Sequence, residues 1–217
     1  LGGAGLYAGL SSAGRFDSAG TLTIGAAGSV DTGGVRAIAS EGINLTANSA
    51  TLAKDSAFSA QGISVTIGKS LISDASIEAT GDLSLSGDTL QLGGDLIANG
   101  SLAIDGRTVS LSGRTIGLAE LRVAAREALN ISGDGDLQSG GVATLSGASV
   151  DNAGRVLGMG GARVDASSTL TNSGAILSGG DASLTSGGDA GLGGTVNANG
   201  KTSVSAGGKA SVTGIVA

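Results

Sequence analysis

The segment DNAGRVLGMGGARV (Asp151–Val164) recurs with substitutions as TNSGAILSGGDASL (Thr171–Leu184). Asn152 aligns with Asn172, and the glycines and aliphatic residues that follow align at the same offset. A fixed period of about 20 to 50 residues is typical of solenoids and other repeat architectures. The question is therefore whether the same period extends over the whole chain.

Three sets of apolar residues keep this period along the chain. The first set closes an apolar–x–apolar unit, at nearly equal intervals, at Ile24, Leu45, Val65, Leu85, Ile104, Val123, Leu145, Val164, Leu184 and Val204. The second set, a predicted core column, contains Ile38, Phe58, Ile77, Leu96, Ile116, Leu137, Val156, Ile176, Val196 and Ile215. A third group lies between them, at Val30, Leu52, Leu71, Leu90, Val109, Leu129, Val150, Leu170, Ala190 and Val212.

Glycines recur between these sets, before the first apolar unit in all repeats but the sixth, which has Ala119, and before the last apolar unit from Gly94 onward. Glycine adopts positive φ without the penalty of a Cβ atom, so these positions are expected at corners of the chain. We predict that Asn152, Gly154, Asn172 and Gly174 are turn residues.

The apolar residues within each unit alternate with polar ones, which is the pattern of a strand with one buried face. Three short strands in each repeat of about 20 residues predict an all-β fold, a right-handed parallel β-helix of about ten coils. The chain has no proline, as expected where almost every residue donates to a hydrogen-bond ladder. We expect one domain over residues 1–217, with an irregular or capping coil at 1–19 and regular coils at 20–217.

One segment favours a different structure. GLAELRVAAREALNI (Gly117–Ile131) contains good helix formers and apolar residues at helical spacing. The alternative to a strand coil is thus a helix inserted between coils. We predict strands, because Leu121, Val123 and Leu129 fall on the periodic apolar positions.

Composition excludes several classes of function. The 12 basic and 18 acidic residues give a net charge of −6, which disfavours binding to nucleic acid. No apolar run is long enough to span a bilayer. The chain has no histidine or cysteine, so it lacks the usual catalytic base and the usual ligands of zinc.

The acidic residues do not define an active site. They fall at varied phases of the repeat, and we expect neither catalysis nor a cofactor, although a polysaccharide-acting β-helix enzyme is kept as an alternative. Asp181 and Asp189 lie in GGDASL and GGDAGL, which are similar to calcium-binding nonapeptide repeats but are not in tandem. We therefore expect no metal site.

The Asn-x-Gly turns in DNAGRV and TNSGAI, each followed by a short alternating strand, resemble filamentous haemagglutinin repeats. These repeats occur in large exoproteins of Gram-negative two-partner secretion systems, which include adhesins and contact-dependent growth inhibition proteins. The resemblance is clearest from Gly141 to Gly214, and over Gly20–Leu137 it consists of the period alone.

The resemblance implies an extracellular β-helical shaft that carries binding or toxic modules away from the cell. The chain would be an internal shaft segment of a larger exoprotein, secreted or exposed at the cell surface. Its partners would be an outer-membrane transporter during export and a receptor on a host or bacterial surface. We expect a monomeric rod, either in an adhesin involved in virulence or in a toxin-delivery protein.

Overall fold

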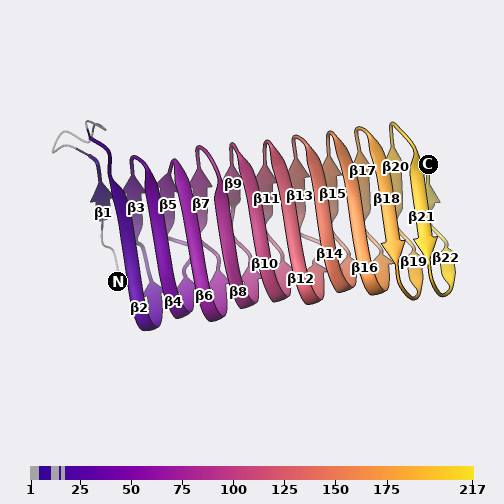
Figure 1. Ribbon diagram of the computed structural model, residues 1–217, viewed down its shortest axis with the longest axis horizontal. Helices are drawn as coiled ribbons and strands as arrows, with labels where there is room; N and C mark the ends of the chain where they lie inside the picture. Colours follow the sequence, from indigo (N-terminus) through magenta and orange to yellow (C-terminus); the bar gives the residue numbers. More distant parts are fainter. Residues whose placement is uncertain (1–4, 11–14, 16–17) are drawn as a thin grey trace.

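The structure, a computed structural model, describes residues 5–10, 15 and 18–217. In this part of the chain there are 23 strands and no helix. The strands stack side by side into a straight rod, through which the sequence advances from one end to the other (Figure 1). Each turn of the chain adds one layer to the rod.

Every coil contains a long segment on one side and a short strand on the opposite side. The long segments of the first eight layers are β2 (Thr21–Thr32), β4 (Gly42–Leu52), β6 (Gly62–Ser73), β8 (Leu83–Leu92), β10 (Ser101–Leu111), β12 (Glu120–Ile131), β14 (Val142–Asn152) and β16 (Gly161–Asn172). In the last two layers this segment is divided into β18 (Asp181–Ser186) and β19 (Ala190–Leu192), and into β21 (Thr202–Ala206) and β22 (Ala210–Val212).

The short strands form the other side of the rod. They are β1 (Gly5–Ala8), β3 (Arg36–Ala39), β5 (Ala57–Ala60), β7 (Ser76–Ala79), β9 (Leu96–Ala98), β11 (Arg114–Gly117), β13 (Asp136–Ser139), β15 (Arg155–Gly158), β17 (Ala175–Ser178), β20 (Thr195–Ala198) and β23 (Ile215–Val216).

The strand pairings are parallel, and each strand pairs with its equivalent in the neighbouring coils. The short strands form an 11-stranded sheet and the long ones a 12-stranded sheet. The prediction of a parallel β-helix of about ten coils is confirmed. The three apolar segments of the predicted coil are present, but in eight coils the first two belong to one continuous strand that bends at a corner.

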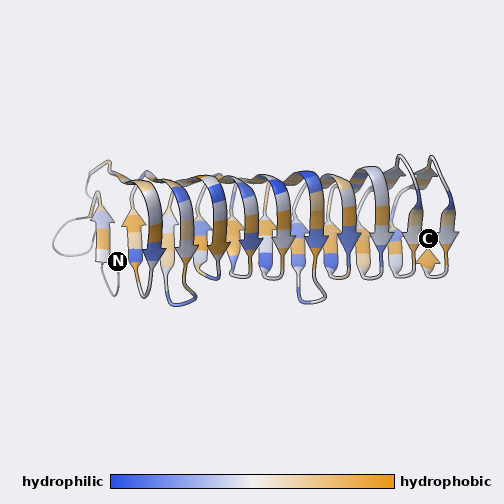
Figure 2. Ribbon diagram, turned by 90° about the horizontal axis from the view of Figure 1, so that it is seen from below, coloured by the Kyte–Doolittle hydropathy of each residue, from blue (hydrophilic) through white to orange (hydrophobic). Residues whose placement is uncertain are grey.

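Polar and apolar residues alternate along the strands (Figure 2). In β4 the side chains of Ile43, Leu45, Ala47, Ala50 and Leu52 are buried, whereas most of the intervening residues face outward. The first apolar set of the sequence is a single column in the structure, because its ten members pair with one another in succession from Ile24 to Val204. The prediction of this column is confirmed.

Differences in coil length are taken up at corners and leave the columns intact. The coil that runs from Val123 to the next column member, Leu145, is longer than the coil that follows it. Part of the additional length lies where the register shifts between Ala124 and Ala128. The rest lengthens the turn between β12 and β13, which projects along an edge of the rod in Figure 2.

The segment with helical propensity is a strand. β12 spans Glu120–Ile131, and the side chains of Leu121, Val123, Leu129 and Ile131 are buried in the core. Pairing with β10 on one side and β14 on the other satisfies the backbone of this segment. Tertiary pairing here overrides the intrinsic preference of Ala, Glu and Arg for helix.

The packing of the core column predicts the effect of a buried charge. Ile176 is completely buried between Val156 and Val196, so Ile176→Asp would place an unpaired carboxylate among aliphatic side chains. We expect the free energy of unfolding to fall by about 4 kcal/mol or more, measured by thermal and denaturant unfolding. The control is Ile72→Asp, because Ile72 faces outward and is 41% exposed. Equal melting temperatures for the two variants would contradict the column assignment.

Candidate functional surfaces

Seven of the ten residues of the predicted core column lie in the core. They lie in the short-strand sheet, where Thr115 of β11 separates the third from the fourth, and they are Phe58, Ile77, Leu96, Leu137, Val156, Ile176 and Val196.

The prediction was wrong for Ile38, Ile116 and Ile215, which face outward. Their places in the column are taken by Ala37, Thr115 and Val216, each one residue away. A shift of one residue along a strand moves the side chain to the opposite face. In the first two of these strands the larger aliphatic residue is next to the position that is actually buried, and sequence periodicity favoured the larger one.

The third apolar set shows the same kind of displacement. Leu52 and Val212 were expected in it, but Ala50 and Ala210 occupy that column in their coils. The alternation of the strand again leaves two neighbouring candidates, and the pairing with the adjacent coil selects the smaller residue.

Asn152 and Asn172, predicted as turn residues, are instead the last residues of β14 and β16. Their side chains point into the core and are 1% and 0% exposed. The Asn152 Nδ2 donates to Asn172 Oδ1 at 2.7 Å and to the carbonyl of Ala175 at 3.5 Å, and the Asn172 Nδ2 donates to the carbonyl of Thr195 at 3.2 Å. The two amides thus connect successive coils at the corner that precedes the short strand.

These asparagines belong to a column that is otherwise mainly aliphatic. Leu92, Leu111, Ile131 and Leu192 occupy the same position in other coils. Among the described residues, Asn152 Oδ1 has no hydrogen-bond partner, as expected from its position next to Ile131. The pair is therefore held by its internal hydrogen bond and its bonds to the following turns.

This arrangement predicts strong coupling between the two asparagines. Asn172→Leu leaves the buried Asn152 amide without its best acceptor and should cost about 1–3 kcal/mol of stability. In Asn152→Leu/Asn172→Leu both amides are replaced by a residue that the column already accepts, so most of the loss should be recovered. A double-mutant cycle measured by denaturant unfolding tests this, and additive single effects would contradict it.

Gly154 and Gly174 do lie in turns, but not because of positive φ. Positive φ in the described residues occurs only at Gly9 (76°), Gly34 (64°) and Gly161 (158°). A Cβ atom at Gly174 would overlap the carbonyl oxygen of Gly154 in the preceding coil. Parallel stacking of the turns brings backbone against backbone, and the absence of a side chain is what permits this approach.

Two glycine substitutions distinguish steric crowding between stacked turns from the conformational freedom of glycine. Gly174→Ala should destabilise the rod by about 1–3 kcal/mol, because the preceding turn would have to move away. Gly133→Ala is the control, since a Cβ atom there meets nothing within 4 Å, and it should be neutral or stabilising by up to about 1 kcal/mol. Melting temperatures of the two variants give the comparison, and a destabilised Gly133→Ala would contradict it.

Three aspartates connect coils through their side chains. Asp82, Asp181 and Asp189 each accept a hydrogen bond at Oδ1 from a backbone N–H of the next coil, donated at 2.8 Å by Ser101, Lys201 and Lys209 respectively. The GGD segments therefore place their carboxylates on the backbone of the next coil. In the part of the chain that the structure describes, no group of three or more Asp or Glu residues could hold a metal ion.

Charged side chains also form ladders between coils. At the corner of the long strands, Arg107 contacts Asp88 at 2.8 Å on one side and Glu127 at 3.2 Å on the other. On the short-strand sheet, Arg114 contacts Asp95 at 3.1 Å, and Arg155 contacts Asp136 at 2.8 Å. Opposite charges on adjacent coils are favourable because equivalent positions are only about 4.8 Å apart.

The corner ladder shifts the protonation of its members. The hydrogen bond from the Arg107 guanidinium holds the pKa of Asp88 below its ordinary value. The same bond raises the pKa of Arg107. The ion pair therefore keeps Asp88 ionised to a lower pH and links two adjacent coils.

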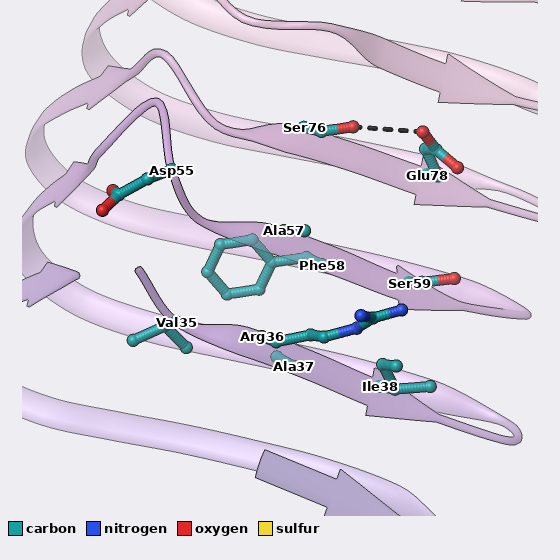
Figure 3. Close-up of a pocket in the computed structure, with 10 residues that line it drawn as sticks. All are labelled: Val35, Arg36, Ala37, Ile38, Asp55, Ala57, Phe58, Ser59, Ser76 and Glu78. Atoms are coloured by element: carbon teal, nitrogen blue, oxygen red, sulfur yellow. Dashed lines mark hydrogen bonds between the residues drawn. The ribbon is translucent and has the colours of Figure 1, made fainter. Parts of the chain in front are cut away.

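A shallow hollow of about 450 Å³ lies on the outer face of the short-strand sheet, over β3, β5 and β7 (Figure 3). It forms because the outward residues of β5, Ala57 and Ser59, are smaller than their neighbours in the adjacent strands, such as Arg36 and Glu78. The Ser76 hydroxyl donates to Glu78 Oε1 at 3.1 Å. The hollow offers a cation, a carboxylate and hydroxyl groups to a polar ligand.

The aromatic ring next to this hollow belongs to the core. Phe58 is only 3% exposed, so it offers no platform on which a sugar ring could stack. The chain has no histidine that could act as a base for the serine hydroxyls. Of the other aromatic residues, Tyr7 is exposed on β1 and Phe16 lies outside the described residues.

The described residues contain no helix that is long and apolar enough to cross a membrane. Comparisons with models of protein families, with curated proteins and with solved structures find no match for the chain.

The period of the apolar residues did not identify the ion pairs and hydrogen bonds between coils. Some of these contacts are nevertheless visible in the sequence. The alternation of Asp95, Arg114, Asp136 and Arg155 is visible once the sequence is written in coils, because these residues recur once per coil at the same phase. The backbone hydrogen bonds of the aspartates give no such signal.

Proposed function

We propose that this chain is a rigid spacer, part of the extracellular shaft of a bacterial surface or secreted adhesin of the filamentous haemagglutinin type. In this role it separates a binding or effector module from the cell. Export would use the outer-membrane transporter of a two-partner secretion system. The shaft of a contact-dependent toxin-delivery protein is the alternative, and it would use the same mechanical property.

The observation that carries this proposal is the continuity of the core columns. The column from Ile24 to Val204 continues through ten coils, although the coils differ in length. At about 4.8 Å per coil, ten coils form a rod of roughly 50 Å. Each coil contacts only its neighbours, so length can change by whole coils without changing the packing.

The outward-facing side chains also support the proposed spacer role. The outward column next to the core of the long strands contains Thr23, Asn44, Ser64, Ser84, Ala103, Arg122, Thr144, Arg163, Ser183 and Ser203, all exposed or half-buried. Several of the charged side chains bond to the adjacent coil, which stiffens the stack. A spacer needs a soluble exterior and a stiff interior, and these features provide both.

A coil-insertion experiment tests the spacer role. In the organism that makes this protein, a second copy of residues 165–184 is inserted after Leu184, which adds one coil in register and about 4.8 Å of length. A spacer should keep surface display and attachment to target cells, or toxin delivery, at the original level. The control inserts only residues 165–174, which moves the columns out of phase and should abolish display.

A second arm separates the spacer from a binding site or an enzyme. Each coil in turn has its outward residues replaced by serine or threonine, and attachment, delivery and polysaccharide cleavage are measured. Uniform tolerance supports the spacer. Loss of function confined to one or two coils, with folding retained, would overturn it in favour of a specific site.

A further inference from the structure

The outer face of the short-strand sheet differs from the rest of the surface. It carries two neighbouring columns of outward side chains, which we call the charge column and the stripe. The charge column consists of Asp95, Arg114, Asp136 and Arg155. The stripe consists of Ile97, Ile116, Gln138, Leu157 and Leu177.

The stripe is apolar at four of its five positions, and the same column is polar at Ser59 and Glu78 before it and at Asn197 after it. The corresponding column of the long strands is polar in nine coils of ten. Leu118 and Met159 lie just beyond the ends of β11 and β15 and are 54% and 58% exposed. Side chains of this kind gathered on one face of a soluble protein typically mark an interaction surface.

The stripe is interrupted in the middle by a polar side chain and a glycine. Gln138 lies between Ile116 and Leu157, and Gly140 occupies the turn position that corresponds to Leu118 in the preceding coil. The coil of β11 therefore presents an apolar ridge, Ile116 and Leu118, next to a coil that presents an amide and a glycine.

The charge column is self-complementary when its direction is reversed. Along the rod its signs are minus, plus, minus, plus, and in the reverse direction they are plus, minus, plus, minus. A two-fold axis parallel to the strands, passing between β11 and β13, would therefore set each charge opposite its counter-charge. Arg114 would face Asp136 of a second copy, and Asp95 would face its Arg155.

The same axis fits the stripe over four coils. It sets the ridge of Ile116 and Leu118 opposite Gln138 and Gly140 of the other copy, and Ile97 opposite Leu157. Leu177 would lie opposite Glu78, which holds this column position in β7, so the matched face comprises the coils of β9, β11, β13 and β15. Self-complementarity of one patch is the requirement for an isologous two-fold contact. The charged side chains are accessible to a second partner, since 33% to 48% of each remains exposed in its ion pair within the chain.

We propose that this face pairs with the same face of a second copy of the chain, with the two rods antiparallel. In the parallel arrangement the charge column would face the stripe of the other copy, which would bury charges against aliphatic side chains. Charge complementarity therefore selects the antiparallel orientation as well as the partner. The expectation of a monomeric rod is the alternative, and the sedimentation experiment below distinguishes the two.

The contact is small, and the association is accordingly weak. Four coils at about 4.8 Å and a strand about 13 Å long give roughly 250 Å² per copy, below the approximately 800 Å² of a standard interface. We expect a Kd of the order of 100 µM for the isolated chain. Many shafts displayed together would bind much more tightly through avidity.

Pairing of the purified chain does not depend on the proposed shaft function. The role of this pairing between cells does rest on that proposed function. Shafts anchored on two facing cells approach each other in antiparallel orientation, so this contact would join cells that make the same protein. The coil-insertion experiment and the association experiment can fail independently, because the first measures reach and the second measures pairing of the purified chain.

Sedimentation of the purified chain at concentrations from about 10 µM to about 1 mM tests the pairing. The weight-average mass should rise from 20.3 kDa toward twice that value as concentration increases. The variant Ile116→Lys/Leu118→Lys should remain monomeric throughout, with at least a tenfold weaker association. Ile72→Lys, on a different outer face, is the matched control and should associate like the unmodified chain.

Charge reversal tests the geometry. Arg114→Asp and Asp136→Arg should each weaken self-association at least tenfold, because like charges then face each other across the axis. A mixture of the two variants should restore association, because the carboxylate introduced at position 114 of one chain then faces the guanidinium introduced at position 136 of the other. Circular dichroism and melting curves establish that each variant is folded. A monomeric mass at all concentrations, or a mixture that associates no better than its components, would overturn the proposal.

Discussion

Parallel stacking of each residue on its equivalent in the next coil is the constraint on which this structure depends. It places residues of similar type on one another in successive coils, so that an aliphatic column such as Leu85, Ile104 and Val123 forms a continuous core. No coil could bury its apolar residues alone, because about 20 ordered residues lose more conformational entropy than a few buried aliphatics return. Stability is therefore shared between neighbours, and the rod is stiff for the same reason.

The same constraint determines which residues are permitted outside the core. Backbone carbonyls of stacked turns lie so close that Gly154 and Gly174 cannot carry a Cβ atom unless the turns move apart. Charges of equal sign would repel each other on adjacent coils, and the observed ladders alternate in sign around Arg107 and Arg114. The Asn152–Asn172 pair shows the cost of a polar group in a column: one amide oxygen has no partner, where the neighbouring coil supplies only Ile131.

Because side chains form columns along the rod, this surface favours interactions that recur in each coil or that are related by a two-fold axis. The proposed spacer role uses the interior, where one coil is equivalent to the next. The proposed pairing uses the exterior of the short-strand sheet, where the alternating charges of four coils can be matched by the same four coils in reverse. Both proposals depend on register and not on a pocket with catalytic groups.

The period of the apolar residues was sufficient to predict the parallel β-helix, the number of coils and the first core column, because stacking requires the same residue type at the same phase. It did not place Ile38, Ile116 and Ile215, since alternation leaves the choice between adjacent positions to the strand pairing, which selected Ala37, Thr115 and Val216. The period also predicted strands over Gly117–Ile131 against the helical propensity of this segment, and the ladders on both sides explain why this prediction is confirmed. Only the tertiary structure decided the burial of the asparagines and the ion pairs, because contacts between coils depend on where each corner absorbs its additional residues.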